Sequence, residues 1–343
     1  MTSDGLAVQT SGPVAPRGQR LSRRARRAVD VPDLVARARD GEARAVARLV
    51  SLVEDASPVL REVAAALAPH TGHAQVLGLT GSPGVGKSTT TTALVRALRA
   101  AGKRVGVLAV DPSSPFSGGA LLGDRVRMQD HAGDPGVYIR SMASRGHLGG
   151  LAWATPQALR VLDAAGCDVV LVETVGVGQS ELEIASLADT TLVLVAPGMG
   201  DGIQAAKAGI LEVADVFVVN KADRDGADST VRDLRYMQSL GGRHAGPGAW
   251  RPPICRTVAS RDEGIDRVLE RIEEHRRWLA ETGEGARRRA ERAAREIEAI
   301  ALAGLRARMG EVRGSAALAA LAGEVVAGET DPYRAADRLL AQL

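Results

Sequence analysis

The chain has 343 residues, of which 45% are hydrophobic and 25% charged, a balance typical of a soluble globular protein with a substantial core. Aromatic residues make up only 2%, too few for the stacking platforms that hold single-stranded nucleic acid, and the two cysteines allow no disulfide framework. The net charge of +3, the lack of a secretory signal and the absence of any run of about 18 apolar residues together predict a cytoplasmic protein outside the membrane.

The first 30 residues are basic, and the run RGQRLSRRARR at 17–27 holds much of the positive charge. Such a run can touch nucleic acid or an acidic partner, but we favour a solvated, disordered tail over residues 1–30 with no nucleic-acid role. Residues 31–73 then form a helical extension, because 31–55 and 57–70 place apolar side chains at intervals of three and four.

Between residues 74 and 283, short apolar runs alternate with helical stretches. The runs are apolar throughout, which indicates strands buried on both faces of a mostly parallel sheet that is covered by helices. We therefore predict an α/β fold with a doubly wound sheet. The predicted strands lie at 76–80, 104–110, 137–142, 168–173, 190–197, 216–223 and 254–260.

Residues 284–343 form a predicted helical arm that follows the last strand. The stretch 285–310 is rich in Ala, Arg and Glu, and shorter helical segments follow at 315–328 and 331–343. One face of the first helix carries Ile297, Ile300, Leu302 and Leu305. The arm packs either on its own domain or on a second copy, and both alternatives stay open; a homodimer is our working hypothesis.

The segment GSPGVGKS at 81–88 fits the pattern G-x-x-x-x-G-K-[ST] and stands between a predicted strand and a predicted helix. This context identifies a phosphate-binding loop of the P-loop NTPase class. Glycines let backbone N–H groups approach the phosphates, Lys87 can bridge the β and γ phosphates, and Ser88 can ligate magnesium. The predicted phosphate-binding residues are Gly81, Ser82, Pro83, Gly84, Val85, Gly86, Lys87, Ser88 and Thr89.

The segment NKAD at 220–223 ends another predicted strand and reads the base. A carboxylate at Asp223 accepts hydrogen bonds from guanine N1–H and the 2-amino group, which adenine does not offer. Asn220 would tie the loops together, and the stem of Lys221 can cover the base. Backbone N–H groups of Ala259 and Ser260 are placed to support guanine O6. The sequence therefore predicts a strong preference for GTP over ATP.

Carboxylates that follow predicted strands can hold the magnesium ion bound with GTP. Asp111 and Glu173 end two apolar runs that we expect to flank the strand of the phosphate loop. Asp124, in GALLGDRVRM, is a further candidate ligand on a loop that can order around the γ-phosphate. Arg127, one helical turn later, can reach a phosphate.

The stretch ETVGVGQSE at 173–181 carries an altered trigger. Many GTPases have Asp-x-x-Gly followed at once by a Gln that orients the attacking water. Here Glu173 can still tether the cation and Gly176 can report the γ-phosphate through its N–H. Val177 cannot orient water, and Gln179 lies two positions further on. This arrangement predicts slow GTP hydrolysis until another protein, or a rearranged switch, completes the site.

Taken together with DPSSPFSGGALLGDRVRM (111–128) and SMASRGHLGGLA (141–152), these motifs resemble the MeaB/ArgK family of GTPases associated with methylmalonyl-CoA mutase. The resemblance spans roughly residues 31–310. It implies a fold related to signal-recognition and metal-insertion GTPases, with an N-terminal helical extension and a C-terminal dimerisation arm. The family's magnesium and switch residues fall on Ser88, Asp111, Asp124, Arg127 and Glu173.

The resemblance also implies a partner, an adenosylcobalamin-dependent acyl-CoA mutase that the GTPase protects and whose cofactor loading it gates. The mutase's adenosyltransferase is a further candidate partner. A second switch falls on 197–209, where Gln204 and Lys207 are candidates for partner-dependent catalysis; their alternative is an exposed helix face. The chain lacks an Asp-x-His-x-x-Gly motif, so we expect cobalamin to be bound by the partner rather than by this chain.

Three other functions share parts of this pattern. A nickel-inserting GTPase needs imidazole or thiolate ligands near the switch, but His70 and His73 precede the first strand and neither cysteine neighbours a histidine. A protein-targeting GTPase needs a Met-rich domain, and the chain has six Met. A scaffold that binds GTP without hydrolysis stays open. An older association of the family name with amino-acid transport kinases finds no support in this sequence.

Overall fold

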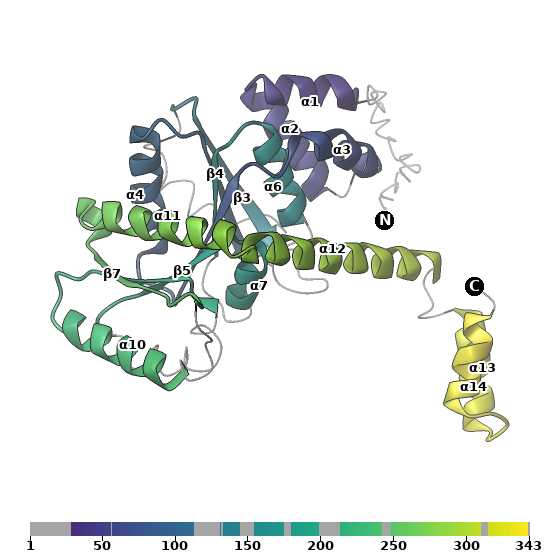
Figure 1. The fold of residues 1–343 in the computed structure, drawn as a ribbon. Helices are drawn as coiled ribbons and strands as arrows, with labels where there is room; N and C mark the ends of the chain where they lie inside the picture. Colours follow the sequence, from purple (N-terminus) through teal and green to yellow (C-terminus); the bar gives the residue numbers. More distant parts are fainter. Residues whose placement is uncertain are drawn as a thin grey trace, which may run out of the picture.

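The fold is that of a three-layer α/β domain with helical N- and C-terminal parts (Figure 1). The apolar runs predicted as strands are strands, and the amphipathic stretches between them are helices. The computed structural model describes residues 29–55, 57–112, 131, 133–144, 154–174, 180–198, 213–241, 248–309 and 315–341.

Within these residues, seven strands form one parallel sheet in the order β3-β2-β4-β1-β5-β6-β7. All six residues of the fourth strand are buried, which explains why its sequence is apolar without alternation. The strands are β1 (Gln75–Thr80), β2 (Val105–Pro112), β3 (Val137–Ser144), β4 (Val169–Thr174), β5 (Thr190–Val195), β6 (Val216–Asn220) and β7 (Ile254–Thr257).

The strand order corrects one expectation about the sheet. β4 does lie next to β1, with Glu173 opposite Leu79. β2, which contains Asp111, pairs instead with β3 and β4, so it lies one strand further from the phosphate loop than predicted. The apolar composition of a parallel strand indicates that the strand is buried, but it does not indicate which strands lie beside it in the sheet.

Helices cover both faces of the sheet, as a doubly wound fold requires. One face packs against α4 and α11, and the other against α6, α7 and α10. Successive strand residues serve opposite faces: Val107 joins the core beneath α4, and Leu108 joins the core beneath α6. These helices are α4 (Lys87–Ala100), α6 (Ala154–Ala164), α7 (Ser180–Leu187), α10 (Ala227–Gly241) and α11 (Ile265–Glu281).

The N-terminal helices pack on α6 and on the edge strand β3 (Figure 1). The stretch 31–55 forms two helices, because Gly41 adopts a left-handed φ of 87° that ends the first one. Its carbonyl accepts a hydrogen bond from the Tyr138 hydroxyl at 3.0 Å, which ties the break to the sheet. The elements are α1 (Val31–Arg39), α2 (Ala43–Glu54), α3 (Leu60–Leu67) and the 3₁₀ turn η1 (Ala68–His70).

Helix α12 (Glu284–Met309) runs along the edge of the sheet where the strands begin and then extends beyond the domain (Figure 1). Near its start, Arg288 pairs with Asp215 and Arg292 pairs with Asp189. Each aspartate directly precedes a strand and also accepts a strand N–H, from Thr191 for Asp215 and from a β1 residue for Asp189. The first half of α12 is therefore fastened to the sheet by buried or half-buried ion pairs.

Further along α12, Glu296 accepts hydrogen bonds from Gln157 and Arg160 of α6. Beyond this point the helix exposes Ile297 (67%) and Leu305 (55%). Two short helices, α13 (Ala316–Val326) and α14 (Pro332–Leu340), pack on each other at its far end (Figure 1). The predicted domain boundary between residues 283 and 284 stays a prediction. In the part of the chain described, no helix has the length and apolar character needed to cross a membrane.

Candidate functional site

The phosphate loop connects the end of β1 to the start of α4, where the sequence places it. Gly81, Gly84 and Gly86 have φ values of 138°, 79° and 95°. A Cβ on Gly81 would lie 2.2 Å from the carbonyl oxygen of Leu194, and one on Gly86 would lie 2.4 Å from the amide nitrogen of Asn220. Both positions therefore require glycine for close approach as well as for backbone conformation.

Lys87 begins α4 and is 7% exposed. Its ammonium group donates to the carbonyls of Gly81 at 2.7 Å and Ser82 at 3.0 Å, so the side chain lies within the curve of its own loop. The loop thus holds one positive charge at the N-terminus of a 14-residue helix, an arrangement suited to a phosphate. Among the other predicted loop residues, Val85 is buried, whereas Pro83 and Thr89 are exposed.

Glu173, at the end of β4, is 4% exposed and faces the first turns of α4. One carboxylate oxygen accepts a hydrogen bond from the Ser88 hydroxyl at 2.6 Å, and the other accepts one from Thr91 at 2.9 Å. A hydroxyl and a carboxylate are hard oxygen ligands, which suit Mg²⁺. The backbone of Asp111 lies at the same edge of the sheet, two strands from β1.

Asn220 joins the phosphate loop to the loops that would hold a base. Its amide nitrogen donates to the carbonyl of Val85 at 2.8 Å. Its amide oxygen accepts from the Ala259 N–H at 3.1 Å and from the Thr257 hydroxyl at 3.2 Å. This is the tie between loops that the sequence indicates. The Ala259 N–H is used by Asn220, however, so the N–H of Ser260 is the better candidate for guanine O6.

The neighbouring residues Lys221 and Asp223 line the same corner. Lys221 has a left-handed φ of 57°, unusual for a residue with a side chain, and its ammonium group donates to the Gly84 carbonyl at 2.7 Å. The carboxylate of Asp223 lies 3.6 Å from the guanidinium of Arg261 and is 40% exposed. Arg261 therefore competes for the carboxylate that we assign to the base, a neighbour that the sequence did not single out.

Six predicted site residues lie outside the described residues. These are Asp124, Arg127, Gly176, Gln179, Gln204 and Lys207. The side chain of Asp111 likewise lies outside the description, although its backbone belongs to β2. Thr91, by contrast, contacts Glu173 and was not predicted. Its spacing of three residues from Ser88 on a helix placed both hydroxyls on one face, a signal that the run TTTT at 89–92 obscured.

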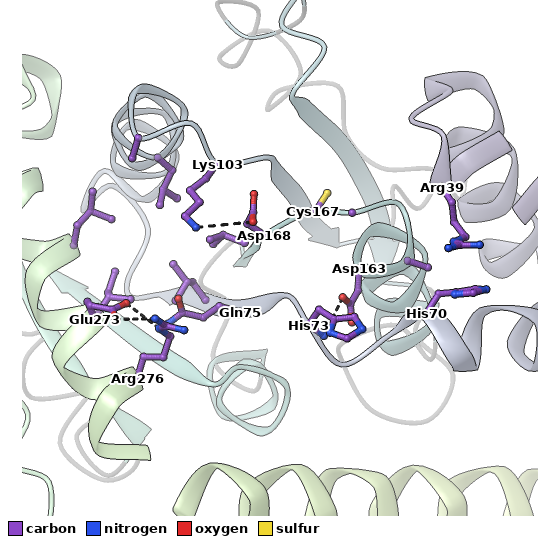
Figure 2. A pocket seen from close by; sticks show the side chains of 18 of the residues that line it. Arg39, His70, His73, Gln75, Lys103, Asp163, Cys167, Asp168, Glu273 and Arg276 are labelled. Carbon is purple, nitrogen blue, oxygen red and sulfur yellow. Dashed lines mark hydrogen bonds and ion pairs between the residues drawn. The ribbon is translucent and has the colours of Figure 1, made fainter. Parts of the chain in front are cut away.

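A cavity of about 660 Å³ at the other end of the strands is lined by some of the residues weighed for a nickel site, together with Asp163 (Figure 2). His70, His73, Asp163 and Cys167 all line it. The carboxylate of Asp163 already accepts backbone N–H groups, including that of Ala74 at 2.9 Å.

Burial also limits the thiol in this cavity: it raises the pKa of Cys167 to about 12, so the thiol stays protonated near neutral pH. Cys255 is buried too, as expected for both cysteines. Nowhere in the described ranges do three or more His, Cys, Asp or Glu side chains gather in a group able to hold a metal ion. The cavity therefore offers no ligand set for the nickel alternative.

Three features together define the class of P-loop GTPases. They are the phosphate loop with Lys87, the contact of Ser88 with Glu173 on the neighbouring strand β4, and the hydrogen bonds by which Asn220 joins the phosphate loop to the base loops. Residues 46–312 match the family model described as methylmalonyl Co-A mutase-associated GTPase MeaB. The chain therefore belongs to the MeaB family, which confirms the resemblance drawn from its motifs.

Individual relatives agree with this assignment. A protein of Pyrococcus abyssi named as a GTPase is 46% identical over 320 residues, covering 91% of this chain and 97% of that protein. The GTPase ArgK of Escherichia coli is 38% identical over 254 residues, 73% of this chain and 77% of its own length. A solved structure described as an LAO/AO transport system kinase superposes with a TM-score of 0.67 at 26% identity, covering 91% and 96% of the two chains. The predicted fold is thereby confirmed.

Proposed function

We propose that this chain is a GTP-hydrolysing chaperone that protects an adenosylcobalamin-dependent acyl-CoA mutase and gates the loading of its cofactor. The observation that carries the GTPase part is the contact of Ser88 with Glu173, which places a hydroxyl and a carboxylate beside Lys87. The partner rests on membership of a family described by its association with methylmalonyl-CoA mutase. Cytoplasmic localisation belongs to the same proposal.

In this function, Lys87 and the backbone N–H groups of the phosphate loop bind the β and γ phosphates. Ser88 and Glu173 would hold Mg²⁺, directly or through water, with Asp111 and Asp124 as further candidate ligands. The ion would neutralise charge that develops on the phosphate oxygens during hydrolysis. Asp223 reads guanine, Lys221 covers the base, and Asn220 keeps the two halves of the pocket in register.

The same function requires help from outside the chain. Val177 follows Gly176 and has no group that can orient water, so hydrolysis by the isolated protein should be slow. The candidates that complete the site are Arg127, Gln179, Gln204 and Lys207. A mutase that binds the GTP form more tightly must, by linkage, also tighten GTP binding. The mutase carries the cobalamin, and its adenosyltransferase is a second candidate partner.

Homodimerisation through α12 is part of this proposal. Its support is a group of four exposed apolar side chains, spread around the outer half of the helix and not covered by the domain: Ile297, Ile300, Leu302 and Leu305. Burial of exposed apolar side chains against a second copy related by twofold symmetry would be favourable.

The test combines purified protein with a candidate acyl-CoA mutase and compares affinity in GDP with that in a non-hydrolysable GTP analogue. We expect the affinities to differ, the mutase to accelerate GTP hydrolysis, and Lys87→Ala to abolish both effects. Lys103→Ala, a half-exposed lysine at the far end of the sheet, is the matched control.

Cofactor loading that runs identically with wild-type protein, with Lys87→Ala and without any GTPase would end the gating proposal. GTP binding with no turnover, even with the mutase present, would favour the scaffold alternative. Activation by nickel-enzyme precursors rather than by the mutase would favour metal insertion.

A further inference from the structure

We infer that Thr91 is a positioning residue that fixes the carboxylate of Glu173 in the metal-binding corner, an inference that rests on the proposed GTPase function. Thr91 is fully buried, three residues after Ser88 on α4. The two hydroxyls contact different oxygens of the same carboxylate, Ser88 at 2.6 Å and Thr91 at 2.9 Å. Both oxygens of the carboxylate thus accept hydrogen bonds from one face of α4.

The Thr91 hydroxyl has a second acceptor within reach, the carbonyl of Lys87 at 3.1 Å. A hydroxyl has one proton and donates it to one acceptor at a time. The carboxylate of Glu173 is both nearer and charged, and hydrogen bonds to charged acceptors are the stronger ones. The Thr91 hydroxyl therefore donates its hydrogen bond to Glu173, and its contact with the Lys87 carbonyl is the weaker one.

The need for this second contact follows from the length of glutamate. At the end of β4 the chain has Glu173 where many GTPases have an aspartate. Glutamate has one more rotatable bond than aspartate, so its carboxylate can reach more positions and one contact fixes fewer of them. Contacts at both oxygens restrict the orientation of the carboxylate more than a contact at one oxygen does. Thr91 thereby restrains a side chain that is longer and more flexible than aspartate.

The two contacts also differ in what happens when Mg²⁺ is held at this corner. Ser88 is a candidate ligand, so its oxygen would turn a lone pair toward the ion. Thr91 lies about one turn after Ser88 in α4 and is fully buried, so we expect it to keep its contact with Glu173 both with and without Mg²⁺. The prediction is that Thr91 affects the metal dependence of nucleotide binding and leaves metal-free nucleotide binding alone.

The experiment compares Thr91→Val, which keeps shape and removes the hydroxyl, with Thr91→Ser, which keeps the hydroxyl. Thr92→Val is the matched control, because the Thr92 hydroxyl donates to the Ser88 backbone carbonyl and does not reach Glu173. Two quantities are measured: the affinity for a fluorescent GDP with Mg²⁺ chelated, and the Mg²⁺ concentration that gives half of the metal-dependent gain in that affinity. Thermal unfolding of each variant establishes that it is folded.

We expect Thr91→Val to raise the half-saturating Mg²⁺ concentration about tenfold, the effect of one lost hydrogen bond to a charged group. Metal-free affinity should stay within about twofold, Thr91→Ser should restore the wild-type Mg²⁺ response, and Thr92→Val should match wild type. Glu173→Asp withdraws the carboxylate from Thr91, so adding Thr91→Val to it should have no further effect.

An unchanged Mg²⁺ response in folded Thr91→Val overturns the inference. So does an equal loss of affinity with and without Mg²⁺, which would mark Thr91 as a merely structural residue of the helix. If the wild-type protein binds GDP with no Mg²⁺ dependence or does not hydrolyse GTP, the proposed function fails, an outcome visible before any variant is compared.

Discussion

The side-chain amide of Asn220 donates a hydrogen bond to the backbone carbonyl of Val85, 135 positions away in the chain. One residue belongs to the phosphate loop and the other ends β6, so the loops that hold the two ends of a nucleotide form a single unit. The amide oxygen of Asn220 extends the same unit to Ala259.

Replacing Asn220 with Ala should therefore weaken both folding and nucleotide binding. Asn220 is 3% exposed, and its loss leaves the Val85 carbonyl and the Ala259 N–H without their partner. Each buried group left unpaired costs about 1–3 kcal/mol. Denaturant unfolding and GDP calorimetry measure the two effects. Gln238 lies on α10, and its side-chain amide donates a hydrogen bond to the Pro252 carbonyl. Gln238→Ala should lower stability and leave GDP affinity unchanged.

Base specificity should change with Asp223. Asp223→Asn replaces an acceptor by an amide that can donate, so guanine loses its partner and the 2-oxo group of xanthine gains one. We expect weaker GDP binding and a preference for xanthosine diphosphate, measured by competition calorimetry. Asp225→Asn, an exposed residue of the same loop, should bind GDP as wild type does. Equal affinity of the wild-type protein for ATP and GTP would remove the argument for base reading.

The oligomeric state should depend on the outer half of α12. Changing both Ile297 and Leu305 to Glu places charge among the exposed apolar side chains of α12, so light scattering should report a monomer that still binds GDP. Tyr236→Glu, an equally exposed apolar position on α10, should leave the dimer intact. A wild-type protein that is monomeric at micromolar concentration would contradict the dimer proposal.

Truncation tests the same proposal if the cut respects the ion pairs of α12. A chain that ends at Ala299 keeps Arg288 and Arg292, so it should be monomeric and stable. A chain that ends before Glu284 leaves Asp215, whose side chain is 9% exposed, without Arg288. Asp215 then keeps the Thr191 N–H and the imidazole of His275 at 3.2 Å but loses its guanidinium partner, so this shorter chain should unfold at a lower temperature.

Stability at the start of α12 should depend on pH through Glu284. Side-chain hydrogen bonds from Arg287, and then from Arg288, lower the pKa of Glu284 from 4.5 to about 2. A lowered pKa stabilises the folded state above pH 4.5, and this contribution disappears as the pH falls toward 2. Glu284→Gln should therefore reduce the melting temperature at pH 7, with the difference from wild type shrinking below pH 4.5.

Local patterns predicted the elements and the two nucleotide loops because each depends on residues close in sequence. The phosphate loop is recognised from a strand, glycines and a helix that lie within a few residues of one another. β4 is recognised from its uninterrupted apolar run. The break at Gly41 was missed because apolar spacing continues across it on both sides. A left-handed glycine ends a helix without disturbing the periodicity of its neighbours.

Contacts between distant segments were beyond the same reasoning. β4 lies between β2 and β1 in the sheet. The residues of β1 and β2 give no indication of this strand order. The Ala259 N–H donates to Asn220, and the Thr91 hydroxyl donates to Glu173. Both hydrogen bonds depend on the placement of loops and helices to within about an ångström, which the sequence does not reveal. Six site residues remain predictions, since they lie outside the described residues: Asp124, Arg127, Gly176, Gln179, Gln204 and Lys207.

The pairing of α12 with Asp189 and Asp215 has a consequence for the order of events during synthesis. A nascent chain leaves the ribosome from its N-terminus, so β1, β5 and β6 are available before α12 has been translated. Each aspartate can take its strand N–H at that stage, which orients the carboxylates along the edge of the sheet. When Arg288 and Arg292 emerge, their acceptors are already in position. Translation should therefore end with the docking of α12 on a preformed sheet, and released chains that end before Glu284 should already resist proteolysis across the sheet.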